Sequence, residues 1–211
     1  MGKGKAIDSS PLIYDLVLAP MELVWFSRWR RRMLFGLKGE VLDIGSGTGA
    51  NLRHYPHSVD CVTVLDPSTH NISYLKRKAG GGGWGERGGR CLKAEVGVGE
   101  KLPFPSKSFD AVVSTLILCT VDDPGKVVSE GIRVLKRGGK FIFIEHQLPR
   151  WKPQALLFNA FTPIWEKPSG CRLNRETGEL VRSRKELFEE LSMIKGPVLG
   201  YPFFLGEYRK K

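Results

Sequence analysis

The most restrictive feature of this sequence is a glycine-rich turn that directly follows a short apolar run. The run spans residues 40–44, and Gly45, Gly47 and Gly49 follow at alternate positions. Glycine adopts the backbone conformations of a tight strand-to-helix turn, and its missing side chain lets a ligand lie against the backbone. The pattern therefore predicts a ligand site at the end of a buried strand.

The rest of the chain favours an α/β architecture. Apolar, β-branched runs alternate with helix-like stretches, as expected of a mostly parallel sheet with helices on both faces. Further strands are expected near residues 61–66, 90–96, 109–116 and 140–145, and helices near residues 48–55, 69–78 and 123–136. The last helix has Asp123 as its predicted N-cap and Pro124 at its first helical position.

Several segments lie outside this alternation. Residues 7–35 form an amphipathic stretch, and the glycine-rich residues 80–89 have so little apolar surface that we expect a mobile loop. Residues 151–182 read as an insertion with a helix near residues 154–166. A helix near 184–193 and two strands near 194–199 and 202–209 would close the chain. If these two strands form a reversed hairpin, the sheet has seven strands.

Length and composition limit the class of protein. With 211 residues we expect an N-terminal segment, residues 1–38, followed by one domain, residues 39–211. No run of 18 apolar residues predicts a membrane-spanning helix. The first residues lack the apolar core of a secretory signal, so we expect a cytoplasmic protein. The cysteines, Cys61, Cys91, Cys119 and Cys171, are widely spread without a CxxC pair, so we expect neither a disulfide framework nor a zinc knuckle.

Two acidic residues narrow the choice of ligand. The glycine spacing fits both a dinucleotide and a nucleoside-methionine pattern. Asp43 lies two residues before the first glycine, where its charge would oppose a pyrophosphate but suits the cationic ammonium and sulfonium groups of S-adenosyl-L-methionine. Asp66 ends the second predicted strand, where a carboxylate can accept hydrogen bonds from both ribose hydroxyls. Together they favour S-adenosyl-L-methionine.

Further motifs point to a family. Residues 99–110 precede the fourth predicted strand, and residues 134–139 precede the fifth. With the glycine turn, they resemble the class I S-adenosylmethionine-dependent methyltransferases, particularly the UbiE-like small-molecule group, over roughly residues 39–145. The segments 114–121, Glu145-His146 and 170–177 are similar to the microsomal alkyl-thiol methyltransferase branch (methyltransferase-like seven). The resemblance implies a Rossmann-like methyltransferase sheet with a C-terminal antiparallel hairpin, and a thiol as the favoured methyl acceptor.

The resemblance also implies roles for single residues. The methionine portion of the cofactor would be held by Asp43, Gly45, Gly47 and Gly49. Asp66 would bind the ribose, Glu100 would lie beside the adenine, and Leu116 would line the pocket. Many relatives carry an acidic residue where this chain has Val98, so the adenine contact is expected to shift to Glu100 or to backbone.

The chemistry asks little of the protein beyond positioning. Methyl transfer from a sulfonium needs an in-line approach of about 3 Å, and a thiol with a pKa near 8.5 is partly ionised without a strong base. His146 is a candidate base or substrate contact, the alternative being a hydrogen-bonded loop histidine. Tyr14 is expected to close over the cofactor or to pack, and Cys119 to line the pocket. His54-x-x-His57 lacks a third ligand at suitable spacing, so no catalytic metal is expected.

The surface suggests a peripheral membrane contact. Within residues 12–32, four arginines are interleaved with Trp25 and Trp29, as suits an anionic membrane interface; the alternative is a lid helix over the active site. The net charge of +11 would also suit a nucleic-acid partner. However, residues 114–117 lack the Asn/Asp-Pro-Pro-aromatic motif that grips a base amine, so we expect none.

The favoured function is methyl transfer from S-adenosyl-L-methionine to a small, apolar acceptor, and a thiol sulfur is the favoured atom to be methylated. N- or C-methylation of a lipid or quinone-type substrate is the enzymatic alternative. A catalytically idle S-adenosylmethionine-binding interaction module is the non-enzymatic one.

Overall fold

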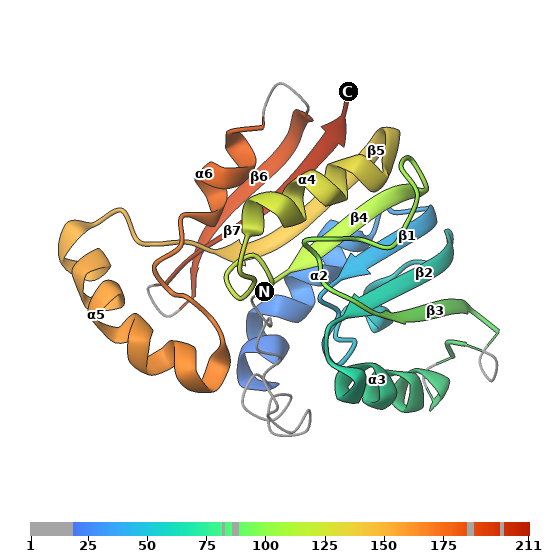
Figure 1. Cartoon of the computed structure of the whole chain (residues 1–211), viewed down its shortest axis with the longest axis horizontal. Coiled ribbons are helices and arrows are strands. Elements are labelled where there is room, and N and C mark those ends of the chain that lie inside the picture. Colours follow the sequence, from blue (N-terminus) through green and yellow to red (C-terminus); the bar gives the residue numbers. More distant parts are fainter. Residues whose placement is uncertain (1–18, 82, 86–88, 185–187, 199–200) are drawn as a thin grey trace.

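A seven-stranded sheet organises the computed structural model, which describes residues 19–81, 83–85, 89–184, 188–198 and 201–211 (Figure 1). The strands are β1 (Gly39–Ile44), β2 (Val59–Asp66), β3 (Cys91–Val96), β4 (Phe109–Thr115), β5 (Leu135–His146), β6 (Phe188–Val198) and β7 (Tyr201–Lys210). Their order is β3-β2-β1-β4-β5-β7-β6, and β7 runs antiparallel to both β5 and β6. The predicted α/β class, seven strands and reversed C-terminal hairpin are confirmed.

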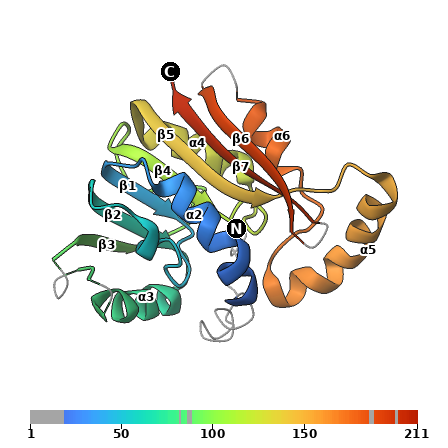
Figure 2. The same ribbon diagram turned by 180° about the vertical axis from the view of Figure 1, so that it is seen from behind.

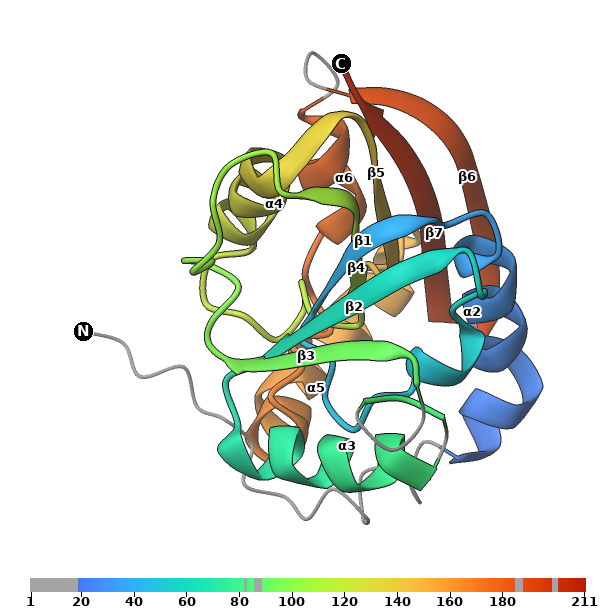
Figure 3. The ribbon, with the colours of Figure 1, turned by 90° about the vertical axis from the view of Figure 1, so that its right-hand side faces the viewer.

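Helices cover both faces of the sheet (Figures 2 and 3). They are η1 (Glu22–Phe26), α2 (Ser27–Leu34), η2 (Leu52–His54), α3 (Thr69–Gly81), α4 (Pro124–Val134), α5 (Lys152–Ser169) and α6 (Thr177–Arg182). Because strand residues alternate between faces, β5 sends Phe141 and Phe143 toward α4 and α6, and Ile142 and Ile144 toward α2 and α3. Each face therefore has its own apolar core.

The start of α4 follows the sequence prediction. Asp123 is the N-cap, and its Oδ1 accepts a hydrogen bond of 3.0 Å from the backbone N–H of Lys126. Pro124 occupies the first helical position, where its missing N–H costs nothing.

Two predicted helices are wrong. The stretch near 48–55 forms only the short η2, because Gly47 and Gly49 have positive φ angles and break a regular helix before it starts. Near 184–193 the chain is already in β6 from Phe188 onward, paired with β7 in antiparallel register. Pairing along a long hairpin overrides the local helical pattern there. Residues 185–187 lie outside the described part of the chain.

Part of the glycine-rich segment packs, contrary to the expectation of a mobile loop at residues 80–89, of which residues 82 and 86–88 lie outside the described part of the chain. Trp84 is buried, and its ring lies 6.3 Å from that of Tyr55. The guanidinium of Arg90 covers the Trp84 ring at 3.7 Å and also donates hydrogen bonds to the carbonyls of Tyr55 and Pro56. Trp84 is therefore held in the fold, which the glycine content of this segment did not predict.

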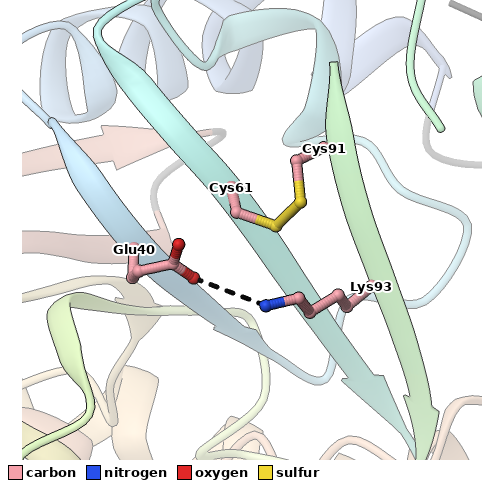
Figure 4. Close-up of a disulfide and its surroundings, with 4 residues drawn as sticks. All are labelled: Glu40, Cys61, Cys91 and Lys93. Atoms are coloured by element: carbon pink, nitrogen blue, oxygen red, sulfur yellow. Dashed lines mark ion pairs between the residues drawn. A yellow bond between two sulfur atoms is a disulfide. The ribbon is translucent and has the colours of Figure 1, made fainter. Parts of the chain in front are cut away.

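A disulfide joins Cys61 and Cys91, although the spread of the cysteines predicted no disulfide framework (Figure 4). The two residues are partners in the parallel register of β2 and β3, with their Cα atoms 4.6 Å apart. Strand pairing brings together cysteines that are 30 residues apart in sequence. Cys119 and Cys171 carry free thiols.

The helices of the described residues are all too short or too polar to cross a bilayer. The longest of them, α5, begins at the second residue of the insertion and stands away from the sheet (Figure 2). It confirms the helix predicted near residues 154–166.

Candidate active site

The predicted site residues gather at the carboxyl edge of the sheet. In β1, Ile44 pairs with Ser114 of β4, and Thr115 of β4 pairs with Ile144 of β5. The glycine turn after β1 and the ends of β4 and β5 therefore lie side by side. The strand order changes direction between β1 and β4, and this is where ligands bind in open α/β sheets.

The three glycines of the turn serve different purposes. All have positive φ angles, of 65°, 51° and 80° for Gly45, Gly47 and Gly49. A Cβ at Gly45 would lie 2.3 Å from Ile117 Cδ1, and one at Gly49 would lie 3.0 Å from Leu75 Cγ. At Gly47 a Cβ would meet nothing within 4 Å. Two glycines therefore permit packing, while the backbone at Gly47 faces open space.

Two buried hydroxyl groups at this edge call for a polar ligand. Within the described part of the chain, Ser46 Oγ and Ser114 Oγ are shielded from solvent and have no hydrogen-bond partner. Ser46 lies in the glycine turn and Ser114 near the end of β4. A buried polar atom without a partner costs free energy unless a ligand supplies one. The open backbone and these hydroxyls fit the polar amino-acid and ribose portions of S-adenosyl-L-methionine.

Asp43 is buried at the end of β1 and already has partners. Its two oxygens each accept a hydrogen bond of 3.0 Å from Asn51 Nδ2, and Oδ2 accepts one of 2.9 Å from the Tyr55 hydroxyl. Burial raises the pKa of Asp43 to about 6, although these hydrogen bonds and the nearby charge of Arg30 oppose the rise. A direct contact with the cofactor, predicted from sequence, stays a prediction.

Arg30 is buried near this carboxylate, whereas the sequence pattern predicted a place on an exposed basic edge. It reaches inward from α2 and donates hydrogen bonds to Asn51 Oδ1 and, at 2.9 Å, to Thr115 Oγ1. Its Nε also lies 3.3 Å from Glu22 Oε2. The other three arginines of the edge, Arg28, Arg31 and Arg32, are exposed. Arg30 thus links the N-terminal helices to the polar residues around Asp43.

Asp66 joins the glycine turn to α3. Its Oδ2 accepts a hydrogen bond of 2.9 Å from the backbone N–H of Gly47. Its Oδ1 accepts bonds from the Ser68 N–H at 2.9 Å and from Asn71 Nδ2 at 3.1 Å. Asp66 ends β2 as predicted, and its role toward a ribose stays a prediction.

Glu100 and Leu116 have different surroundings. Glu100 Oε1 accepts a hydrogen bond of 3.1 Å from the Asp122 N–H, so this carboxylate is directed toward the start of α4. Val98, which replaces the usual acidic residue, is exposed. Leu116 has a φ angle of 59°, which is unfavourable for leucine, and packs against Phe26 and Phe203. Strained residues of this kind cluster at functional sites.

His146 ends β5 and is buried, with its Nε2 only 2.8 Å from Cys171 Sγ. The hydrogen bond from Cys119 and the nearby imidazole of His146 hold the pKa of Cys171 below its usual range despite burial. Sequence reasoning missed the pairing of His146 with Cys171, because Cys171 lies within the insertion, 25 residues further along the chain. It also missed that Arg30, Asn51 and Tyr55 form a hydrogen-bonded network around Asp43. Tyr14 lies outside the described residues.

The pH dependence of stability should report on Asp43. Its raised pKa means that the folded state binds a proton more tightly than the unfolded state, so stability falls as the pH rises from about 4 to about 6. Relative to Asp43→Asn, the wild-type protein should lose about 3 kcal/mol of unfolding free energy between pH 4 and pH 7, measured by urea titration.

The pKa of Asp110 is lowered by Lys136, although burial opposes this shift. An Asp110→Asn comparison should therefore show the opposite sign below about pH 4. For the first comparison, equal pH profiles of unfolding free energy for wild type and Asp43→Asn would contradict the raised pKa of Asp43 in the folded state.

Comparison with known proteins agrees with this geometry. A family model described as a methyltransferase domain matches residues 42–143. Human thiol S-methyltransferase TMT1B is 36% identical over 172 residues, covering 78% of this chain and 66% of that protein. Human thiol S-methyltransferase TMT1A is 30% identical over 193 residues, covering 89% of this chain and 76% of that protein. The chain thus spans just under two thirds of the length of TMT1B.

Solved structures show the same fold. A geranyl diphosphate methyltransferase, solved in complex with S-adenosylmethionine, superposes with a TM-score of 0.70 at 13% identity. The match covers 92% of this chain and 89% of that chain. Strand order, glycine turn and sequence similarity lead to one conclusion: the chain belongs to the class I S-adenosyl-L-methionine-dependent methyltransferases, a family that includes the thiol S-methyltransferases.

Proposed function

We propose that this protein transfers a methyl group from S-adenosyl-L-methionine to the sulfur of a small, apolar thiol. The observation that carries the proposal is the similarity to two human thiol S-methyltransferases over 78% and 89% of this chain. The arrangement at the carboxyl edge supports it, because the glycine turn and the ends of β4 and β5 lie together there.

The cofactor supplies a methyl group that its sulfonium has already activated. The open backbone at Gly47 and the unpartnered Ser46 hydroxyl would bind its polar portions, and Asp66 would bind the ribose. Asp43 would add a negative charge behind the turn when it is ionised. Glu100, whose carboxylate accepts a hydrogen bond from the Asp122 N–H just before α4, would lie beside the adenine.

The acceptor would bind beside Leu116 and His146. The aromatic rings of Phe26, Trp29 and Phe203 pack against one another here, and the His146 ring lies edge-on to Phe203 at 6.2 Å. Such a lining favours an apolar group next to the reacting sulfur. About 3% of an ordinary thiol is ionised at pH 7, so the protein needs chiefly to align the sulfur rather than to remove a proton with a strong base.

We also propose a peripheral membrane contact through the N-terminal helices. Leu23 and Val24 of η1 and Phe35 after α2 are exposed, and the exposed Arg28, Arg31 and Arg32 lie between them in sequence. This combination of apolar and cationic side chains suits an anionic interface. A second exposed apolar surface on α5 comprises Leu156, Leu157, Phe161 and Ile164.

Methyl transfer to a panel of acceptors tests the proposed activity. Radiolabelled S-adenosyl-L-methionine should label short alkyl thiols, while lipid amines and quinols of similar size remain unlabelled. Labelling of the amines or quinols instead would favour the N- or C-methyltransferase alternative. Cofactor binding without turnover of any acceptor would support the idle binding module and contradict the proposal.

Asp66→Ala tests the cofactor site. Loss of a buried polar contact should weaken S-adenosyl-L-methionine binding by roughly 1–3 kcal/mol, measured by calorimetry. Asp60→Ala is the matched control, because Asp60 lies on the same strand but is exposed, and its binding should equal that of the wild type. Unchanged affinity in Asp66→Ala would show that the ribose is bound elsewhere.

Flotation with phosphatidylserine-containing vesicles tests the membrane contact. We expect the protein to float with these vesicles, less so with neutral ones, and less at high salt because exposed charges are then screened. Leu23→Asp/Val24→Asp should reduce the floating fraction severalfold, whereas Val96→Asp, on the distant edge strand β3, should not. Leu156→Asp/Leu157→Asp shows whether α5 takes part. Wild-type protein that stays in the bottom fraction would rule out the contact.

A further inference from the structure

Three sulfur and nitrogen donors converge near the end of β5. Cys119 follows β4, His146 ends β5, and Cys171 follows α5. His146 Nε2 lies 2.8 Å from Cys171 Sγ, and the three donor atoms all lie within 4.8 Å of one another. Cys119 and His146 are buried, and Cys171 is half-buried. The cluster thus joins three segments that are distant in sequence, with two of its donors buried.

The segments that carry these donors are tied together by their own hydrogen bonds. The Arg172 N–H donates to the Cys119 carbonyl at 3.0 Å, and the Leu148 N–H donates to the Arg175 carbonyl at 2.9 Å. The Thr177 hydroxyl donates to the carbonyl of His146. These bonds place the donor atoms through the backbone, so the cluster does not depend on flexible side chains alone.

The donor set is that of a thiophilic cation. Two thiolates and one imidazole suit zinc, whereas magnesium and calcium require oxygen ligands. In a tetrahedral zinc site the donor atoms lie about 3.5 Å apart, as follows from bonds of about 2.3 Å to sulfur and 2.0 Å to nitrogen. His146 Nε2 and Cys171 Sγ are 2.8 Å apart, and the other two donor pairs are at most 4.8 Å apart, so the observed distances lie on both sides of this value. Side-chain movements of about 1 Å would bring all three donors to it.

A buried carboxyl group lies beside the cluster. Glu145 precedes His146 in β5 and is buried close to both thiols. Its Oε1 accepts hydrogen bonds of 2.9 Å from the N–H groups of Ile117 and Leu118. Its Oε2 is shielded from solvent without a hydrogen-bond partner in the described part of the chain.

We propose that Cys119, His146 and Cys171 bind a zinc ion, with the fourth tetrahedral position open. Zinc binds both cysteines as thiolates, so each thiol that is still protonated releases its proton to solvent on binding, and affinity rises with pH. Three protein ligands and one open position are the arrangement of catalytic rather than structural zinc sites. An acceptor thiol is a suitable fourth ligand; that extension rests on the proposed function, whereas the zinc site itself does not. His146 bound to zinc through Nε2 could not also act as the base through that atom.

The experiment uses the full chain with Cys61→Ser/Cys91→Ser as background. These substitutions leave Cys119 and Cys171 as the only cysteines, so the second thiol pair cannot bind metal under reducing conditions. The background protein is freed of metal with a chelator, and zinc is titrated against a chromophoric competitor without cofactor or acceptor. We expect about one zinc per chain, and at least a tenfold loss of affinity on adding Cys119→Ser, Cys171→Ser or His146→Ala. His54→Ala is the matched histidine control and should bind like the background protein.

Two further readouts keep the test independent of whether the variants fold. Zinc should protect both remaining cysteines of the background protein from alkylation by iodoacetamide, and cobalt substitution should give thiolate-to-cobalt absorption in the near ultraviolet. Unprotected cysteines, or zinc binding equal to that of the Cys119→Ser/Cys171→Ser chain, would overturn the site. Since no methyl transfer is measured, failure here leaves the proposed function to its own test.

Discussion

The site depends on a buried network that joins Arg30, Asn51 and Asp43. Asp43 is taken out of water at the end of β1, and burial of a carboxylate is costly unless partners compensate. Asn51 and Tyr55 donate hydrogen bonds to it, and Arg30 binds Asn51 from the other side. The network therefore holds the residues that follow the glycine turn against the end of β1.

Arg30 also explains why the N-terminal helices belong to the site. Its guanidinium reaches Thr115 at the end of β4 and Glu22 in η1. Burial alone would raise the pKa of Glu22, but hydrogen bonds from His54 and Arg53 and the charge of Arg30 lower it to about 2. One cation thus bridges a helix on one face of the sheet to the edge where the ligand is proposed to bind. A surface-bound role for these helices is compatible with this arrangement, because Arg28, Arg31 and Arg32 remain exposed.

The two sides of the proposed reaction are built differently. On the cofactor side, a continuous stretch of sequence forms the turn, and Asp66 fixes it through the Gly47 N–H. On the acceptor side, the end of β5 meets residues that the insertion returns after α5. Contacts such as Arg172 N–H to the Cys119 carbonyl hold this return path in place. The acceptor side therefore requires the insertion to be folded, whereas the glycine turn forms from neighbouring residues.

The sequence by itself determined the alternation of strands and helices, the glycine turn and the places of Asp43, Asp66, Leu116 and His146 at strand ends. These features follow from local rules: the period of apolar residues, the φ angles open to glycine, and the cap at Asp123. Only the tertiary structure decided that Arg30 points inward, that Trp84 packs, that β6 begins as early as Phe188, and that cysteines meet in pairs. Each of those depends on partners more than 20 residues away: Thr115 for Arg30, Tyr55 for Trp84, Cys91 for Cys61, and Cys171 for Cys119. For β6 the deciding partner is the paired strand β7. Local patterns carry no record of such contacts, because burial and pairing energies arise only once the sheet has assembled.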